Sequence, residues 1–308
     1  MIGKVWGGDN FLATYWKDGV ATSLTQGNGE AYVGEMSIVG QDVYIAGYEY
    51  NGDNPVAAYW KNGVETKLTA DSITSYCKSI DVVGNDVFVS RYIKDGNRTV
   101  ATYWKNGSPI LLSNSQYSTN AISIRVVGND VHVAGYESNG TAHKAVYWKN
   151  GVRKDLSLNG QNVQAVQAHA MTVVNNNVYI TGYELANTSY GAIYWKNASQ
   201  SNLSNGSDES FARGVAVDGS NVYIAAYEKV GTKRVAVYWK NEVLTKLSDG
   251  SNDAEAFGVA IDGDDVYVSG IERINGETVA VYWKNGSQVR LTEPGSTSFT
   301  TGIAITKE

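Results

Sequence analysis

The stretch ARGVAVDGSNVYIAAYEKVGTKRVAVYWKNEVLTKLSDG, residues 212–250, decides the fold because it contains four short runs separated by turn residues. In the first run, Val215 and Val217 alternate with smaller residues, and this period of two is typical of a β-strand. The second and third runs, NVYIAAYE and RVAVYWK, are rich in the β-branched and aromatic residues that favour strands. The fourth run is short and ends in Leu247. The stretch therefore predicts four consecutive antiparallel strands joined by tight turns.

The same pattern recurs along the chain. The tripeptide Tyr-Trp-Lys occurs seven times, with its tryptophans at Trp16, Trp60, Trp104, Trp148, Trp195, Trp239 and Trp283. The successive spacings are 44, 44, 44, 47, 44 and 44 residues, and a leucine follows each tryptophan by eight positions. The repetition predicts a single domain, residues 1–308, built from seven repeats of about 44 residues.

Four antiparallel strands in a repeat of roughly 40–50 residues are typical of a β-propeller blade. Residues 302–305 match a first strand, whereas the sequence begins within a second strand. We therefore expect an all-β, seven-bladed β-propeller with four antiparallel strands per blade, in which the N- and C-terminal strands together close the last blade. A ring closed in this way leaves no open sheet edge.

Turn residues and tryptophans have structural interpretations. Asn-Gly or Asp-Gly between the third and fourth runs predicts two-residue turns with positive φ. Asn197-Ala198 and Asn241-Glu242 depart from this pattern, so we expect wider turns or another turn type there. Asp42 and its counterparts are expected to bind backbone amides of the turn before the second strand. We expect the repeated tryptophans to fill the space between adjacent sheets, as a scaffold rather than a ligand platform.

Composition narrows the possible partners and cofactors. The net charge of −6, from 25 Lys+Arg against 31 Asp+Glu without a basic block, argues against nucleic acid and anionic membranes. The sequence contains no apolar run of ~18 residues, so we expect no membrane insertion. A single cysteine, Cys77, excludes an internal disulfide and a multi-cysteine metal site, and the string DGDD at 262–265 lacks the spacing of a calcium loop. We expect a monomer with no cofactor and no bound metal.

Functional residues are expected where the repeats disagree. The disagreement is largest at the entry to each first strand, and the predicted central channel would gather these positions at one mouth. The predicted ligand-binding residues are Tyr32, Tyr76, Lys78, His169, Phe211, Arg213, Phe257 and Phe299. Acidic residues accompany them in these loops, namely Glu30, Glu209, Asp253 and Glu255. Aromatic faces beside charged groups are suited to a sugar, a peptide or a small anion.

Enzymatic motifs are lacking. The three histidines, His132, His143 and His169, lie singly, and none belongs to an HExxH or GxSxG motif. The favoured interpretation is a non-catalytic binding or interaction module that presents the channel mouth and its variable loops to a carbohydrate or protein ligand. Two alternatives stay open: a polysaccharide hydrolase or lyase acting at the same mouth, and a purely structural spacer of a surface protein.

The unit VYIAGYE at 43–49, followed by YWKNG at 59–63, resembles tandem repeats of secreted or surface-attached bacterial proteins. The resemblance implies a β-propeller and an extracellular or cell-surface location, although the start, MIGKVWGGDN, has no apolar signal segment. Trp-Lys replaces the Trp-Asp of WD40 repeats, and neither the Gly-Gly of kelch repeats nor a sialidase Asp-box is present. The activities of those families therefore cannot be assigned to this chain.

Overall fold

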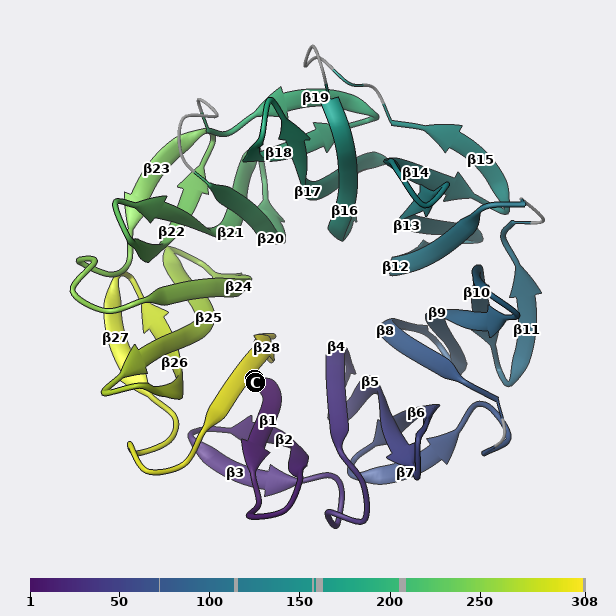
Figure 1. Cartoon of the computed structure of the whole chain (residues 1–308), viewed down its shortest axis with the longest axis horizontal. Helices are drawn as coiled ribbons and strands as arrows, with labels where there is room; N and C mark the ends of the chain where they lie inside the picture. Colours follow the sequence, from purple (N-terminus) through teal and green to yellow (C-terminus); the bar gives the residue numbers. More distant parts are fainter. Residues whose placement is uncertain (72, 114–115, 157, 159–162, 205–208, 307–308) are drawn as a thin grey trace. The chain divides into compact units, whose positions relative to one another are not determined.

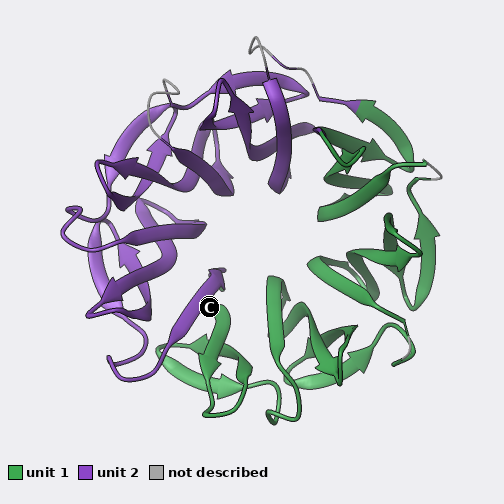
Figure 2. Ribbon diagram, in the orientation of Figure 1, with its two compact units in different colours: residues 1–141, 145–154, 306–308 green, residues 142–144, 155–305 purple. Residues whose placement is uncertain are grey.

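The structure is a computed structural model that describes residues 1–71, 73–113, 116–156, 158, 163–204 and 209–306. These residues form strands and turns, which confirms the all-β prediction. Among them there is no helix long and apolar enough to span a membrane. The chain divides into two compact units (Figure 2): unit 1 comprises residues 1–141, 145–154 and 306–308, and unit 2 comprises residues 142–144 and 155–305.

Unit 1 contains β1 to β15, apart from the first two residues of β14 and the last residue of β15 (Figure 1). The strands are β1 (Ile2–Trp6), β2 (Phe11–Lys17), β3 (Val20–Ser23), β4 (Ala31–Val39), β5 (Asp42–Asn51), β6 (Asn54–Lys61), β7 (Val64–Lys67), β8 (Ser75–Val83), β9 (Asp86–Asp95), β10 (Arg98–Lys105), β11 (Ser108–Leu111), β12 (Ser118–Val127), β13 (Asp130–Ser138), β14 (His143–Lys149) and β15 (Val152–Asp155).

Unit 2 contains the remaining strands. They are β16 (Val163–Val174), β17 (Asn177–Ala186), β18 (Ser189–Lys196), β19 (Ser199–Asn202), β20 (Ser210–Asp218), β21 (Asn221–Val230), β22 (Lys233–Lys240), β23 (Val243–Lys246), β24 (Ala254–Asp262), β25 (Asp265–Ile274), β26 (Glu277–Lys284), β27 (Ser287–Arg290) and β28 (Ser298–Gly302).

Consecutive strands pair in order, so each repeat folds as an antiparallel sheet such as β4-β5-β6-β7 or β20-β21-β22-β23. The hydrogen-bonded sheets formed by the described residues number six rather than seven. The reason is one parallel pairing inside unit 2, His143 with Ala165, which connects β14 with β16 and merges two repeats into an eight-stranded sheet.

The register identifies β1 as a second strand. Ile2 pairs with Tyr15 in β2, just as Ala46 in β5 pairs with Tyr59 in β6. The chain therefore begins within a second strand, as expected, and within unit 1 the strands β1, β2 and β3 are equivalent to the second, third and fourth strands of a repeat.

The turns between third and fourth strands share one conformation. Asn62 and Gly63 both have positive φ, 51° and 84°, as expected for Asn-Gly. The expectation of a different turn at Asn197-Ala198 and Asn241-Glu242 is wrong. Ala198 (φ 71°) and Glu242 (φ 68°) adopt the same left-handed conformation, and the flanking strands keep two-residue loops. The register of the sheet imposes the turn even where the residue carries a Cβ that disfavours it.

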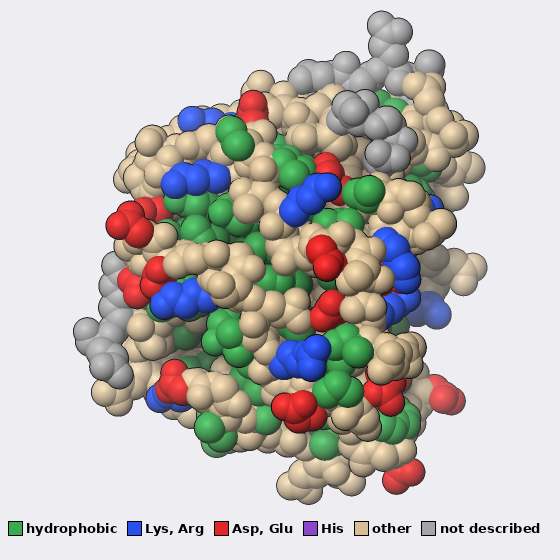
Figure 3. Space-filling model, turned by 90° about the vertical axis from the view of Figure 1, so that its left-hand side faces the viewer, with side chains coloured by type: hydrophobic (Ala, Val, Ile, Leu, Met, Phe, Trp, Pro, Cys, Tyr) green, Lys and Arg blue, Asp and Glu red, His purple; other side chains and the backbone are tan. Residues whose placement is uncertain are grey.

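A repeated polar clamp lies beside these turns and corrects the role expected for Asp42. The Oδ1 of Asn62 accepts the Val43 backbone N–H at 2.8 Å, while Asn62 Nδ2 donates to Asp42 Oδ1 at 2.7 Å and Lys61 Nζ lies 2.8 Å from Asp42 Oδ2. Asp42 therefore binds side chains rather than the turn amides, because Asn62 already occupies the amide. The Lys61 ammonium also lies 5.1 Å from the centroid of the Tyr44 ring, and this cation–π contact explains why the second run repeats a tyrosine at this position and the third run ends in a lysine. In the view of Figure 3, basic and acidic side chains are interspersed over the surface.

The tryptophans fill the core between sheets, as expected. Trp60 and its counterparts have at most 2% of their surface exposed, with Trp104 as the exception. Trp60, for example, packs with Ile2 and Ala13 of the preceding sheet. Burial of such a large aromatic side chain stabilises the fold by about 3–5 kcal/mol relative to Ala.

Trp104 is less buried than the other repeated tryptophans because the residue beside it is Arg91, whereas the equivalent residue in the preceding sheet is Gly47. At Gly47 an added Cβ would lie 3.0 Å from the Trp60 ring, whereas Arg91, only 3% exposed, places its guanidinium carbon 4.7 Å from the centroid of the Trp104 ring. Burial lowers the pKa of Arg91 to about 10 and raises that of the paired Cys77 thiol to about 12. Cys77 is therefore an inert thiol of the core.

Neighbouring sheets of a unit are also joined by hydrogen bonds in which a Ser or Thr hydroxyl oxygen accepts a backbone N–H of the third strand. Thr119 Oγ1 accepts the Ala101 backbone N–H at 3.0 Å in unit 1, and Ser210 Oγ accepts that of Ala192 at 2.8 Å in unit 2. This packing places the first strands of a unit beside one another, β4, β8 and β12 in unit 1, with the fourth strands on the opposite side (Figure 1).

Candidate functional site

Every complete first strand contains a β-bulge close to its entry. In β8 the ladder passes from Cys77 to Ser79, and in β20 it passes from Ala212 to Gly214, so Lys78 and Arg213 have no partner in the ladder. The other bulged positions are Gly34 with Glu35, Ile122, His169 and Phe257. A bulge bends the strand and redirects a side chain. The most variable position of the repeat is therefore the bulged residue, whose side chain does not follow the alternation of side chains between the two faces of the sheet.

Half-buried tyrosines form a continuous row in unit 1. Tyr32 stacks on its cross-strand partner Tyr48 at 5.1 Å between ring centroids, and Tyr76 stacks on Tyr92 at 5.0 Å. Tyr48 and Tyr76 meet edge to face at 5.0 Å, which joins the two pairs. Lys78 Nζ lies 5.9 Å from the Tyr48 centroid. The structure thus brings together the predicted residues Tyr32, Tyr76 and Lys78 around Tyr48.

One end of this row is charged. Lys4 takes the place of Tyr48 in the sheet of β1, and its Nζ lies 3.9 Å from the centroids of both Tyr32 and Phe11. Glu30 accepts a hydrogen bond from the Tyr32 hydroxyl and lies 3.8 Å from Lys4 Nζ. Burial raises the pKa of Tyr32, and the hydrogen bond to Glu30 acts in the same direction. The Tyr32 phenol therefore stays a neutral hydrogen-bond donor at physiological pH.

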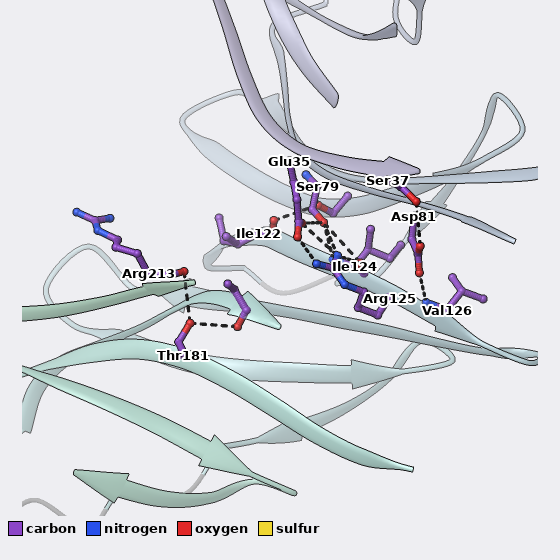
Figure 4. A network of polar contacts seen from close by, with 12 residues as sticks. Glu35, Ser37, Ser79, Asp81, Ile122, Ile124, Arg125, Val126, Thr181 and Arg213 are labelled. Carbon is purple, nitrogen blue, oxygen red and sulfur yellow. Dashed lines mark hydrogen bonds and ion pairs between the residues drawn. The ribbon is translucent and has the colours of Figure 1, made fainter. Parts of the chain in front are cut away.

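A polar network joins the first strands of unit 1 just beyond the bulges (Figure 4). Arg125 of β12 pairs with Glu35 of β4, and Arg125 Nη1 lies 3.2 Å from Ser79 Oγ of β8. Asp81 Oδ2 accepts the Val126 backbone N–H at 2.7 Å, which links β8 to β12 a second time. Burial raises the pKa of the Asp81 carboxyl against the opposing effect of the Arg125 charge. These groups satisfy one another, so the network connects strands rather than presenting free groups.

Unit 2 gathers His169, Phe211 and Arg213. Phe211 stacks on Tyr227 at 5.2 Å and meets the Tyr183 ring edge at 4.7 Å, while His169 lies 5.4 Å from Tyr183. The Arg213 guanidinium carbon lies 5.4 Å from the Phe211 centroid, and its Nη1 is 3.2 Å from His169 Nδ1. The three predicted residues of β16 and β20 are therefore neighbours.

Acidic residues neutralise a second arginine in unit 2. Arg234 Nη1 donates to Glu255 Oε1 at 2.6 Å, its Nη2 lies 3.8 Å from Glu209, and its guanidinium carbon lies 5.1 Å from the Tyr227 centroid. Burial raises the pKa of Tyr227 to about 12, so this phenol also stays protonated.

The two remaining predicted residues occupy other strands of unit 2. Phe257 is the bulged residue of β24 and Phe299 lies in β28, both half-buried. Among the described residues, Phe257 takes part in none of the ring contacts of the Phe211 cluster. Each unit is thus shown to contain a cluster of its own, and a single mouth combining all eight residues stays a prediction.

Sequence reasoning missed the second-strand partners of the predicted residues. Tyr48, Tyr92 and Tyr227 belong to the repeated second run, yet each stacks on an aromatic residue of the neighbouring first strand. Tyr183 belongs to the same run; it pairs with Gln167 in the ladder and meets Phe211 of the next sheet. Cross-strand pairing predicts such pairs once register is known. Among the described residues, no group of three or more His, Cys, Asp or Glu is placed to hold a metal ion.

Comparison with known proteins supports the fold. TolB from Acinetobacter baumannii matches with a TM-score of 0.50 and 10% sequence identity, over 76% of this chain and 62% of the TolB chain. The chain therefore spans less than two thirds of that protein. No protein-family model and no curated protein matches the sequence. TolB is a β-propeller protein, so the chain has a propeller-like fold of repeated four-strand antiparallel sheets, and at this identity the likeness concerns the fold alone.

Proposed function

We propose that the chain is a non-catalytic binding module whose ligand is a carbohydrate, bound against the bulged first-strand residues and the aromatic pairs beside them. The observation that carries the proposal is the coincidence of three features at the bulges of β8, β16 and β20: a variable side chain, release from the strand ladder, and neighbouring half-buried aromatic rings. Strand bulges are enriched next to functional sites, where they redirect side chains. Aromatic surfaces with a few convergent polar groups are suited to small polar ligands.

The chemistry at the bulges favours a sugar. Burial raises the pKa of Tyr48, so its phenol stays a hydrogen-bond donor, while Glu30 offers a carboxylate acceptor and Lys4 and Lys78 add cations over aromatic rings. A sugar ring offers hydroxyl groups to such donors and acceptors and C–H faces to such rings. Tyr and Arg are also enriched in protein interfaces, so a protein ligand is the alternative outcome of the test.

The proposal includes a seven-bladed ring in which β28 completes the sheet of β1, β2 and β3. Supporting it, β1 has the register of a second strand, and β28 carries Ser298, the counterpart of the first-strand residue Ser210. Removing residues 298–308 is expected to abolish the hydrogen-exchange protection of those β1 amides that do not bond to β2. Unchanged protection would contradict ring closure.

The function is tested by glycan-array binding followed by calorimetry with two lysine variants. Lys78→Ala removes a bulge cation beside Tyr48, and Lys61→Ala is the matched control because Lys61 also lies over a tyrosine but belongs to the clamp at the other end of the sheet. We expect Lys78→Ala to weaken glycan binding about tenfold and Lys61→Ala to leave it unchanged.

Equal binding by both variants would remove the bulged face as the site. Binding of a purified protein partner but no glycan would replace the carbohydrate with a protein ligand. A reducing-end release assay on the bound glycans separates a binding module from a hydrolase or lyase.

A further inference from the structure

Arg213 differs from the other arginines of the candidate site in what neutralises it. Arg125 pairs with Glu35, and Arg234 pairs with Glu255 and Glu209. Among the residues that the structure describes, no carboxylate forms an ion pair with Arg213, and its side-chain contacts are with His169 and the Phe211 ring. Within the described part of the chain, the positive charge of Arg213 is therefore not paired with a carboxylate.

The guanidinium of Arg213 retains unused donors. Its Nη1 is 3.2 Å from His169 Nδ1, whereas its Nε is buried and has no hydrogen-bond partner in the described structure. The buried Nε is closed to a ligand, but Nη2 is not buried and forms no hydrogen bond with the described residues, so a ligand that accepts from Nη2 gains free energy. The planar fork of arginine matches the two oxygens of a carboxylate.

The position of Arg213 is fixed rather than free. It is the bulged residue of β20, and its carbonyl oxygen accepts from Thr181 Oγ1 at 3.4 Å while its side chain extends away from Thr181 (Figure 4). The next residue, Gly214, tolerates no side chain, because an added Cβ would lie 2.5 Å from the Phe257 carbonyl oxygen. The backbone on both sides of Arg213 is therefore held by its neighbours, which limits the entropy lost when a ligand binds.

An aromatic surface lies directly beside this cation. The Phe211 ring meets Tyr183 at 4.7 Å and Tyr190 at 5.0 Å, and Tyr183 meets Tyr190 at 5.3 Å. A ligand that bridges the three rings and Arg213 needs a ring with an apolar face and an attached anionic group. A sugar that carries a carboxylate has both parts.

We propose that Arg213, positioned by His169 and Phe211, binds the carboxylate of an acidic sugar, so that the ligand is a uronate-containing carbohydrate. This inference rests on the proposed carbohydrate-binding function and names the class of sugar. The carboxylate accepts hydrogen bonds from the Arg213 guanidinium, and its sugar ring lies against Phe211, Tyr183 and Tyr190.

The test compares binding of galacturonate, glucuronate and mannuronate oligomers with the same oligomers as methyl esters, by calorimetry on the full chain. We expect at least one acid to bind about tenfold more tightly than its ester, since the ester keeps the ring but loses the charge. Arg213→Gln should remove this preference, and Arg213→Lys should retain only part of it because the ammonium lacks the fork. Arg98→Gln is the control and should keep the preference, because Arg98 lies outside the candidate site and pairs with Asp95.

The outcomes separate the two proposals. Equal affinity for acids and esters, or a preference that survives in Arg213→Gln, overturns the role of Arg213 and leaves the binding module standing. Absence of binding to any glycan overturns both. A sulfated oligomer that binds more tightly than the uronate contradicts the carboxylate and identifies a different anion. Thermal midpoints of the variants show whether a loss of binding reflects unfolding, and Arg213→Lys keeps the test valid if Arg213→Gln does not fold.

Discussion

Unit 1 and unit 2 join their first strands by different chemistry although their sheets share strand order, turns and bulges. In unit 1, side chains of Glu35, Ser79, Asp81 and Arg125 cross from strand to strand. In unit 2, five of the six equivalent positions of β16, β20 and β24 are Ala or Gly, so few side chains cross between these strands: Ala170, Thr172, Gly214, Ala216, Gly258 and Ala260. The backbones of neighbouring first strands approach closely in both units, at Gly34 in unit 1 and at Gly214 in unit 2. The comparison shows that the repeated residues determine the four-stranded sheet and its packing on the next sheet. The residues that join neighbouring first strands differ from one repeat to the next.

The largest effect is expected where unit 2 depends on close approach. Gly214→Ala places a Cβ 2.5 Å from the Phe257 carbonyl oxygen and should lower the free energy of unfolding by about 3 kcal/mol. Gly191→Ala is the matched control in unit 2, because its added Cβ would make only ordinary van der Waals contacts, at 3.5 Å with Ser204 Oγ and at 3.9 Å with Glu184 Cγ. Chemical denaturation measures both variants. If Gly214→Ala is as stable as Gly191→Ala, the first strands of unit 2 do not depend on glycine.

A smaller effect is expected from breaking the network of unit 1. Arg125→Ala should lower the free energy of unfolding by about 2 kcal/mol, because Glu35 is then left half-buried without its partner. The double variant Glu35→Ala with Arg125→Ala should lose less than the two single losses added together, since it makes unit 1 resemble unit 2. Arg98→Ala, which breaks the exposed pair with Asp95, is the control and should change stability by less than about 0.5 kcal/mol. Additive losses would show that the network contributes no coupling.

The smallest effect concerns the second residue of the two-residue turns, which differs between the units although the turn conformation is the same. Unit 1 places glycine second in each of the four turns between third and fourth strands, whereas unit 2 has Ala198 and Glu242 at positive φ. Ala198→Gly should raise the free energy of unfolding by about 1 kcal/mol, because glycine relieves the left-handed strain. Gly63→Ala in unit 1 should lower the free energy of unfolding by a similar amount, because Gly63 also has positive φ. Thermal unfolding measures both variants. An unchanged free energy of unfolding for Ala198→Gly would mean that other interactions in the folded chain offset the strain at Ala198.

The strand pattern was predictable because period-two alternation and Asn-Gly turns act locally. Spacing of the Tyr-Trp-Lys tripeptide also predicted the burial of residues such as Trp60. The turn at Ala198 was predicted wrongly because sheet register overrides the preference of one residue. Asp42 was assigned the wrong partner because the amide it was expected to bind is taken by Asn62, twenty residues further on.

The candidate site was predictable in part. Variation among repeats identified Lys78, His169 and Arg213, but it gave no sign that each is the residue skipped by the ladder, because a bulge depends on two strands together. Tyr48 and Lys4 were not predicted for the same reason, because they become functional candidates only through their contacts with Tyr32 on the neighbouring strand or sheet. The salt bridge between Glu35 and Arg125 joins residues ninety positions apart, a separation that repeat comparison does not connect.

The skipped residue in each first strand has a consequence for engineering. A side chain outside the ladder is exchanged without altering register, so Lys78, Ile122, His169, Arg213 and Phe257 form a set that a combinatorial library can randomise while the framework stays constant. Selection from such a library would turn one scaffold into reagents for many targets, much as loop randomisation does in antibodies.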